Sequence, residues 1–303
     1  MVAAGLIEVP RAGPDSSVAA WTAHLLAVSV AQLAAVDGGV VAGDVDCIHR
    51  YRVATRRFRC YLSDFKSLLP EGPNEAMGSK LHELSCVVGV VRDLDVLALR
   101  LAERACGLPD VDRPAARDLA AYLAQQRLQA HTQLVEMFRC TAHKRLVDSL
   151  VEFAAQPWGC AGPDASGAKQ AERMAIRLTK RRWKALAIMV SQAGEAPSDE
   201  QLHEIRVAAK RCIYAAQAAV IVVGKPAQRF AQRLEVVKTV LGEHQNGVFA
   251  EAWLRASAQQ LTECRLVIGE YMAAEKIAMA KARADWPAAW ETASRRQARR
   301  WLD

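Results

Sequence analysis

The sequence predicts an all-α protein built from two four-helix units, and three features of the chain support this prediction. Apolar residues recur at helical spacing along most of the 303 residues, strand-like alternation is almost absent, and turn-forming breaks leave segments long enough for helices. The β-branched run Val220–Val223 is too short and too isolated to indicate a sheet. With 51% hydrophobic and 24% charged residues, the chain is expected to bury a sizeable core.

Clusters of glycine and proline set the expected ends of the helices. They occur, in chain order, at Gly38-Gly39, Pro70–Pro73, Gly107–Pro114, Pro157–Gly167, Gly194–Pro197 and Gly224–Pro226. A capping box, in which Gln201 follows Ser198 by three residues, marks one helix start directly after Pro197. Helices are therefore expected at 18–37, 45–69, 76–106, 115–155, 168–193, 198–223, 226–258 and 260–284.

The first of these helices resembles a membrane span, because residues 16–36 contain no Asp, Glu, Lys or Arg. The run nevertheless contains His24, Gln32 and many alanines, and it has few large apolar residues. The residues before it carry two carboxylates and one basic residue, Arg11, which does not match the basic start of a secretory leader. We therefore expect a buried helix in a soluble protein that has no membrane partner.

The composition also predicts a cellular compartment and a class of partner. Eight cysteines are dispersed without a CxxC pair, which is typical of core thiols in a reducing cytoplasm. The 40 Lys and Arg residues exceed the 33 Asp and Glu residues, so the net charge is +7. This excess favours a polyanionic partner but does not identify it.

The clearest pattern in the chain is an internal repeat. The segment 49–57 aligns with 203–211 at an offset of 154 residues, with the shared pattern H-x-x-R-V-A-x-[RK]-R. The segment 89–93 aligns with 242–246 at an offset of 153, which also pairs Lys80 with Arg233. Two anchors in the same order at nearly equal spacing predict a duplicated four-helix unit joined by residues 157–167.

The repeated motif places basic side chains along one helix edge. At 100° per residue, His203, Arg206 and Lys210 lie at about 0°, 300° and 340° around the helix. Such a ridge of like charges is unfavourable unless an anion neutralises it, and arginine forks match phosphate oxygens. A basic face that is simply solvated is the commoner explanation for either motif alone, but repetition of the histidine favours a function. For Arg92 and Asp93, an internal salt bridge and a ligand role are equally compatible with the sequence.

Four ordered motifs resemble the conserved histidine α-helical domain, or CHAD, family. They are H-R-Y-R-V-A-T-R-R (49–57), V-R-D-L-D-V (91–96), H-E-I-R-V-A-A-K-R (203–211) and L-G-E-H-Q-N (241–246), and the resemblance covers about 18–285. The resemblance implies two four-helix bundles related by a pseudo-twofold axis in one CHAD-type domain. It also implies a basic central channel that binds inorganic polyphosphate, association with polyphosphate granules, and no catalytic activity.

Carried over by position, the resemblance assigns phosphate contacts in both halves. They are His49, Arg52, Arg56, Arg57, Lys80 and Arg92 in the first half, and His203, Arg206, Lys210, Arg211, Arg233 and His244 in the second. A further set could extend the lining, although a solvated face is at least as good an explanation for each: Arg181, Arg182, Lys184, Arg229 and Lys238. Because the first helix has no Lys or Arg while its counterpart is rich in both, the basic surface is expected to be lopsided.

The resulting division of the chain has five parts. It comprises an N-terminal extension 1–17, a first half 18–156, a linker 157–167, a second half 168–285 and a C-terminal tail 286–303. The tail, which places tryptophans among arginines, suggests no function. Because few residues precede the first helix, we do not expect the triphosphate tunnel domain of the CYTH type that some family members carry.

Other functions fit the sequence less well. No metal or cofactor site is expected, because the helical pairs that begin at His82 and His203 reach Cys86 and Val207 where a second histidine would be needed. No catalytic triad, paired carboxylates on one helix face or phosphate-binding loop stands out, so an enzyme is not expected. Nucleic acid is a less favoured partner, because the ridges lack interleaved aromatic residues. A helical adaptor for an acidic protein remains open, and so does the oligomeric state.

Overall fold

The protein is all-α, as the sequence predicts. The computed structural model describes residues 8–156, 158 and 165–303, and it contains no strand among them. In chain order, the helices are α1 (Val18–Ala42), α2 (Val45–Asp64), α3 (Glu71–Ala105), η1 (Asp110–Asp112), α4 (Arg113–Arg139), α5 (Thr141–Ala155), α6 (Ala165–Ala193), α7 (Asp199–Val223), α8 (Lys225–Gln260), η2 (Thr262–Cys264), α9 (Arg265–Ser294), α10 (Arg296–Arg299) and η3 (Arg300–Leu302).

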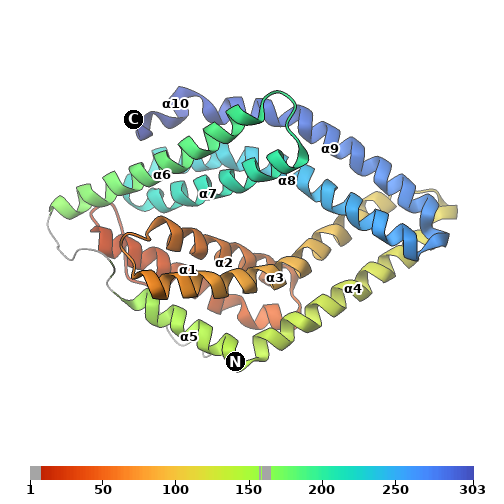
Figure 1. The fold of residues 1–303 in the computed structure, drawn as a ribbon, viewed down its shortest axis with the longest axis horizontal. Helices are drawn as coiled ribbons and strands as arrows, with labels where there is room; N and C mark the ends of the chain where they lie inside the picture. The colour runs from red at the N-terminus through yellow and green to blue at the C-terminus, as the bar shows by residue number, and fades with distance from the viewer. Residues whose placement is uncertain (1–7, 157, 159–164) are drawn as a thin grey trace.

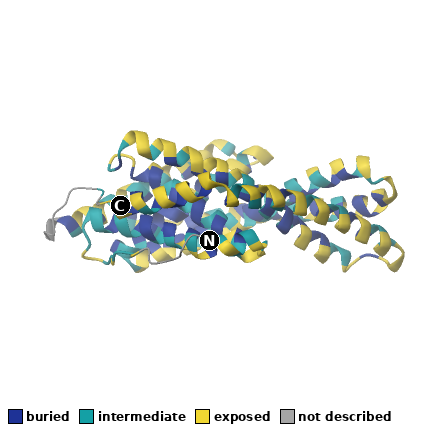
Figure 2. Cartoon of the chain, turned by 90° about the horizontal axis from the view of Figure 1, so that it is seen from below, coloured by how far each residue is buried: buried dark blue, intermediate teal, exposed yellow. Residues whose placement is uncertain are grey.

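The helices form two groups that lie side by side. Helices α1 to α5 make up one group and α6 to α10 the other, and the long helices α3, α4, α8 and α9 meet at one end of the molecule (Figure 1). Seen from the side, buried residues lie along the surfaces where helices meet and exposed residues cover the outer faces (Figure 2). The groups contact each other directly through α2 and α7 and through α3, α8 and α9.

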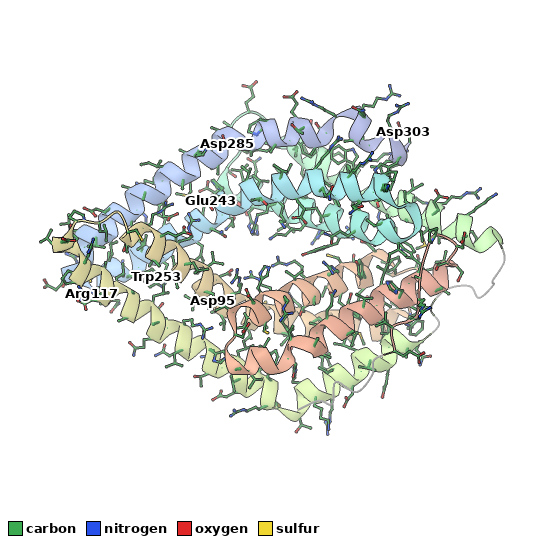
Figure 3. The ribbon with its side chains drawn as sticks, turned by 180° about the vertical axis from the view of Figure 1, so that it is seen from behind. Asp95, Arg117, Glu243, Trp253, Asp285 and Asp303 are labelled. Carbon is green, nitrogen blue, oxygen red and sulfur yellow. The ribbon has the colours of Figure 1, made fainter. Side chains whose placement is uncertain are left out.

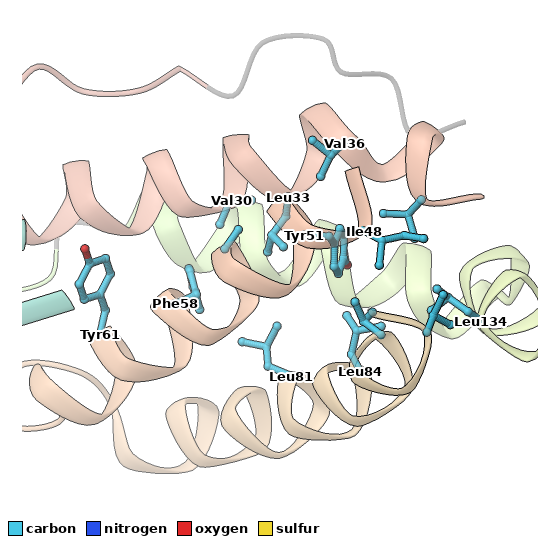
Figure 4. Packing of buried hydrophobic residues seen from close by; sticks show 14 of the residues in the cluster. Val30, Leu33, Val36, Ile48, Tyr51, Phe58, Tyr61, Leu81, Leu84 and Leu134 are labelled. Atoms are coloured by element: carbon cyan, nitrogen blue, oxygen red, sulfur yellow. The ribbon is translucent and has the colours of Figure 1, made fainter. Parts of the chain in front are cut away.

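Helix α1 is long and apolar enough to cross a membrane, but it is packed in the core of the first group. Val30, Leu33 and Val36 point toward apolar residues of α2 such as Ile48 and Phe58 (Figure 4). Trp21 of the same helix donates a hydrogen bond from Nε1 to the carbonyl oxygen of Ala218 in α7, at 2.9 Å. The expectation of a buried helix therefore agrees with the structure.

Two glycines that were expected to end the first helix lie inside it. Helix α1 continues through Gly38-Gly39 to Ala42 and ends at Gly43, whose φ of 82° is in the left-handed region. A Cβ placed on Gly39 would lie 2.3 Å from Sγ of Cys47 in α2. Gly39 therefore allows α1 and α2 to approach closely. In the sequence, a glycine at a close helix contact looks the same as a glycine that ends a helix.

The predicted single helix over 115–155 is wrong, because the structure has two helices there. Cys140 adopts an extended backbone, with φ −68° and ψ 143°, so α4 ends before it and α5 begins after it. The bend lets α5 pack against α1, where Nε2 of His143 lies 2.9 Å from Oδ1 of Asp37. No glycine or proline marks this bend in the sequence. The helix that α5 packs against, α1, is distant from it in the chain.

The ends of the second group also differ from the expected bounds. Of the predicted linker, residues 157 and 159–164 lie outside the described residues, whereas 165–167 begin α6. Helix α9 continues through Pro287 to Ser294, beyond the expected end at 284. Residues that were assigned to a tail pack into the core of the second group, where Trp290 stacks on Trp183 with ring centres 5.0 Å apart.

A buried ion-pair cluster fastens the two groups together at the junction of α3, α8 and α9. Nη1 of Arg100 lies 2.7 Å from Oε1 of Glu243, and Nη2 of Arg100 pairs with Oε2 of Glu275. Arg104 adds a contact of 3.3 Å from Nε to Oε1 of Glu275. The Glu275 side chain is 0% exposed, whereas Glu243 is 45% exposed. Figure 3 labels Glu243 on α8 of the second group and Asp95 on α3 of the first.

We expect Glu275→Gln to lower the free energy of unfolding by about 2–3 kcal/mol, because it leaves a buried arginine short of its charged partner. Glu243→Gln is the matched control, and its loss should stay near the 0–1 kcal/mol typical of exposed pairs. Chemical denaturation of both variants measures the difference. Equal losses would show that burial of Glu275 does not matter for the junction.

Candidate functional site

The two copies of the repeated basic motif face each other across the junction of α2 and α7. Arg52 and Arg56 of α2 act electrostatically on Arg206 and Lys210 of α7, so the four side chains lie within range of mutual repulsion. All four are half-buried, and they occupy the edges of helices whose other faces are packed in the core. We call Arg52, Arg56, Arg206 and Lys210 the cationic cluster.

Glycines on the neighbouring helices give the two repeated arginines their positions. Nη1 of Arg52 donates to the carbonyl oxygen of Gly89 in α3, at 3.1 Å. A Cβ placed on Gly242 of α8 would lie 3.4 Å from Nε and Nη2 of Arg206. Gly89 and Gly242 are the residues that the predicted repeat pairs, and the arginine of each half lies against the glycine of that half.

The arginines differ in their counter-ions. Arg52 pairs with Asp93 through a contact of 2.6 Å from Nη1 to Oδ1, so Asp93 forms an internal salt bridge with Arg52. The position equivalent to Asp93 in the second half is Asn246, which carries no charge. Arg56, Arg206 and Lys210 form no ion pair with any residue that the structure describes. Nε of Arg206 is buried and lacks a hydrogen-bond partner there.

Burial and mutual repulsion shift the titration of the cluster. Burial, followed by Arg206, Arg56 and Arg52, lowers the pKa of Lys210 to about 6. Burial, followed by Arg56 and Arg52, lowers the pKa of Arg206 to about 10. The cluster therefore holds three guanidinium groups and a lysine that is mostly neutral at pH 7, and an anion placed among them would favour the charged lysine.

Three further predicted residues lie at the edge of the cluster. His49 lies at the surface, where neighbouring side chains partly desolvate its ring; this desolvation, then Arg92, Arg52 and Lys238, lowers its pKa below the ordinary value. Lys238 also acts on Lys210, although its own ammonium pairs with Glu235 one helical turn away. His49, Arg92 and Lys238 therefore lie within electrostatic range of the edge of the cluster.

The histidines of the second half lie in different settings. His203 is exposed, and its Nδ1 lies 2.8 Å from Oε1 of Gln245. His244 is 1% exposed, and its Nε2 lies 3.2 Å from Oδ1 of Asp199. Burial and the nearby Arg283 lower the pKa of His244. The assignment of His244 to the phosphate contacts does not agree with this burial, because its ring does not reach the surface.

Several other candidate residues lie away from the cluster or are held by the protein itself. Arg182 donates to Oδ1 of Asp64 from Nε at 2.8 Å, and Arg181 contacts the same oxygen at 3.1 Å. These two arginines therefore link α6 to the end of α2 rather than form a solvated face. Arg57 is turned toward α1 and donates to two glutamines. The remaining candidates are exposed or half-buried and have no ion pair among the described residues: Lys80, Lys184, Arg211, Arg229 and Arg233.

Residues that help to build the site were not among the candidates. Gly89 and Gly242 support the arginines, and Gln245 positions His203. All three belong to the aligned segments 89–93 and 242–246, so the repeat contained a signal for them. Tyr214, which lies beside both Arg56 and Arg57, could not be told from an ordinary core residue.

The comparisons with known proteins identify the family. The CHAD domain model matches residues 24–255. This chain belongs to the CHAD family. The resemblance that the four motifs carry is thereby confirmed, and the matched CHAD region contains both basic motifs and the whole cationic cluster.

Two curated relatives of this CHAD protein come from Mycobacterium tuberculosis. They are the uncharacterized protein MT2285 of strain CDC 1551 / Oshkosh and the uncharacterized protein Rv2226 of strain ATCC 25618 / H37Rv. Each is 30% identical over 228 residues, which cover 74% of this chain and 43% of the relative. The aligned part of the chain thus spans less than half the length of these relatives.

Solved structures share the CHAD fold. The CHAD domain from the plant Ricinus communis superposes with a TM-score of 0.75 at 19% identity, covering 95% of each chain. PptA from Streptomyces chartreusis superposes with a TM-score of 0.70 at 17% identity, covering 91% of this chain and all of that one. At these identities, the likeness establishes the all-α fold.

Proposed function

We propose that this CHAD protein binds inorganic polyphosphate at the cationic cluster, in a basic groove between the two halves, without making or breaking bonds. The observation that carries the proposal is the convergence of Arg56, Arg206 and Lys210 from two helices without a described carboxylate partner. Cations held together in this way repel one another, so a ligand that supplies closely spaced negative charges would relieve the repulsion. A phosphate chain supplies one such charge per unit.

The arrangement of the basic residues favours an extended ligand over a single phosphate. His49, Arg92 and Lys238 extend the basic surface beyond the cluster, and His203 lies on the same helix as Arg206. Guanidinium groups would bind phosphate oxygens in pairs, and the lysine would add a point charge. We propose a cytoplasmic location and association with polyphosphate granules as part of the same function.

Nucleic acid is a rival polyanion, and the tyrosines near the motifs argue against it. Tyr51 is 1% exposed and Tyr214 is 8% exposed, so neither offers a free ring face for stacking on a base. Binding of nucleic acid at the cluster would then depend on phosphate contacts alone. Polyphosphate presents the same charges at closer spacing and without bases that need to be accommodated.

Titration of the full chain with long-chain polyphosphate at several salt concentrations tests the proposal. Affinity should fall steeply with salt, because the ligand releases bound counterions when it contacts the cluster. In competition at equal charge, polyphosphate should displace random duplex DNA and single-stranded RNA. An acidic protein is included as a third competitor. If DNA, RNA or the acidic protein binds in preference to polyphosphate, that molecule and not polyphosphate is the ligand.

A further inference from the structure

A small recess lies where α1 and α2 of the first half meet α7 of the second. It measures about 240 Å³. Its lining includes the polar side chains of Arg57, Tyr61 and Gln217 and the apolar side chains of Leu25, Val28 and Ile221. Cavities that hold drug-sized ligands usually measure about 300–1,000 Å³, so this recess suits a smaller molecule.

Arg57 carries the positive charge of the recess, and its described partners are neutral. Nη1 donates to Oε1 of Gln32 at 3.2 Å and Nη2 donates to Oε1 of Gln217 at 3.4 Å. Nε is buried and has no hydrogen-bond partner among the described residues. A buried N–H group without a partner is costly, and a guanidinium without a counter-ion in a partly buried setting adds to that cost. An anion in the recess would supply the missing counter-ion.

The recess is separate from the cationic cluster. Arg57 follows Arg56 in the sequence, but a rotation of about 100° per residue turns its side chain away from the cluster toward α1. There the guanidinium lies over the ring of Tyr214, with Cζ 5.8 Å from the ring centre. Tyr214 also lies beside Arg56, so this buried ring stands next to both sites.

The rest of the lining indicates what kind of anion fits. If a bare phosphate ion occupied the recess, the apolar side chains of Leu25, Val28 and Ile221 would stay in contact with water. An anion with an organic body would cover these side chains. His24 also lines the recess, and its Nδ1 lies 2.7 Å from the carbonyl oxygen of Pro10. Because a carbonyl oxygen only accepts, Nδ1 carries the proton, and Nε2 could donate to an anion only in a ring that is protonated on both nitrogens.

We propose that this recess is a second binding site, for a small carboxylate with a short apolar or aromatic body, whose carboxylate pairs with Arg57 while its body packs against Leu25, Val28 and Ile221. The site is independent of polyphosphate binding. Its ligand would contact both halves of the domain at once, since Arg57 belongs to α2 and Gln217 to α7.

A fluorine NMR titration of the full chain with 4-fluorobenzoate tests the proposal, and 4-fluorobenzyl alcohol serves as the uncharged probe of the same shape. The acid should bind at least tenfold more tightly than the alcohol. Arg57→Gln should remove this preference, and Val28→Phe should weaken both probes by filling the recess while keeping the charge. Arg206→Ala is the matched control in the cationic cluster and should leave binding of the acid unchanged.

Three results would overturn the proposal. Equal affinities of the acid and the alcohol would show that Arg57 does not pair with the carboxylate. Weakening of the acid by Arg206→Ala, with no effect of Val28→Phe, would place the anion in the cationic cluster. Displacement of the acid by inorganic phosphate at equal concentration would make the recess a site for bare phosphate. None of these results depends on whether polyphosphate binds, because no experiment uses it.

Discussion

A chain in which both Arg206 and Lys210 are replaced by alanine is expected to bind polyphosphate at least about 100-fold more weakly than the wild type. Hydrogen bonds to charged groups contribute about 1.5–3 kcal/mol each, and two of them would contribute about 3–6 kcal/mol to binding. Each 1.4 kcal/mol corresponds to about tenfold in affinity. Isothermal titration calorimetry at a fixed salt concentration measures the loss.

The melting temperature of this double variant separates a binding role from a structural one. Arg206 and Lys210 repel each other and the arginines of α2, so their removal should leave the protein as stable as the wild type or more stable. The control is Lys184→Ala with Arg229→Ala, which removes one lysine and one arginine from exposed positions outside the cluster. Similar losses of affinity in both double variants would show that overall charge, not the cluster, determines binding. Unfolding of the first variant would show that these residues are structural.

The fold class and most helix positions were predictable because they depend on local patterns. Apolar spacing of 3.6 residues and glycine or proline breaks are properties of a short stretch of chain, and they located α2, α7 and α8 closely. The bend at Cys140 and the continuation of α1 through Gly39 were not predictable in this way. Both result from contacts between helices, with Asp37 and Cys47 as the distant partners.

The cationic residues of the site were named from the sequence, but their partners were not. Helical spacing showed that Arg52 and Arg56 share an edge of α2, and the repeat showed that Arg206 and Lys210 do the same on α7. Which of them keeps a free charge depends on carboxylates that reach them from other helices. Asp93 comes from α3, 41 residues after Arg52, and no pattern in the sequence links the two.

The burial of His244 has the same origin. Its motif matched a family position for phosphate contact, yet the ring is enclosed beside Asp199 at the start of α7. A motif specifies residue types and their order along the chain, whereas exposure depends on how closely α7, α8 and α9 pack. Exposed and buried residues of a motif can therefore be distinguished only when the packing of the helices is known.

Binding of polyphosphate is expected to take up close to one proton at pH 7, and its affinity should fall as the pH rises above about 6. The free protein has a Lys210 pKa of about 6, so this lysine is mostly neutral at pH 7. Phosphate oxygens beside it would favour the ammonium form and raise its pKa in the complex. Between the two pKa values the complex holds a proton that the free protein lacks, so affinity drops by up to about tenfold per pH unit.

Arg206, Arg56, Arg52 and Lys238 lie close to Lys210, and each of them lowers its pKa. His49, whose pKa lies below its ordinary value, adds a gain in affinity only at more acidic pH. Lys210→Arg keeps the positive charge but moves the titration far above neutral pH, so the affinity of this variant should be nearly constant between about pH 6.5 and about pH 8.5. Titrations in buffers of different ionisation enthalpy count the proton directly. A wild type whose affinity is as flat as that of Lys210→Arg would mean that the phosphate chain does not contact Lys210.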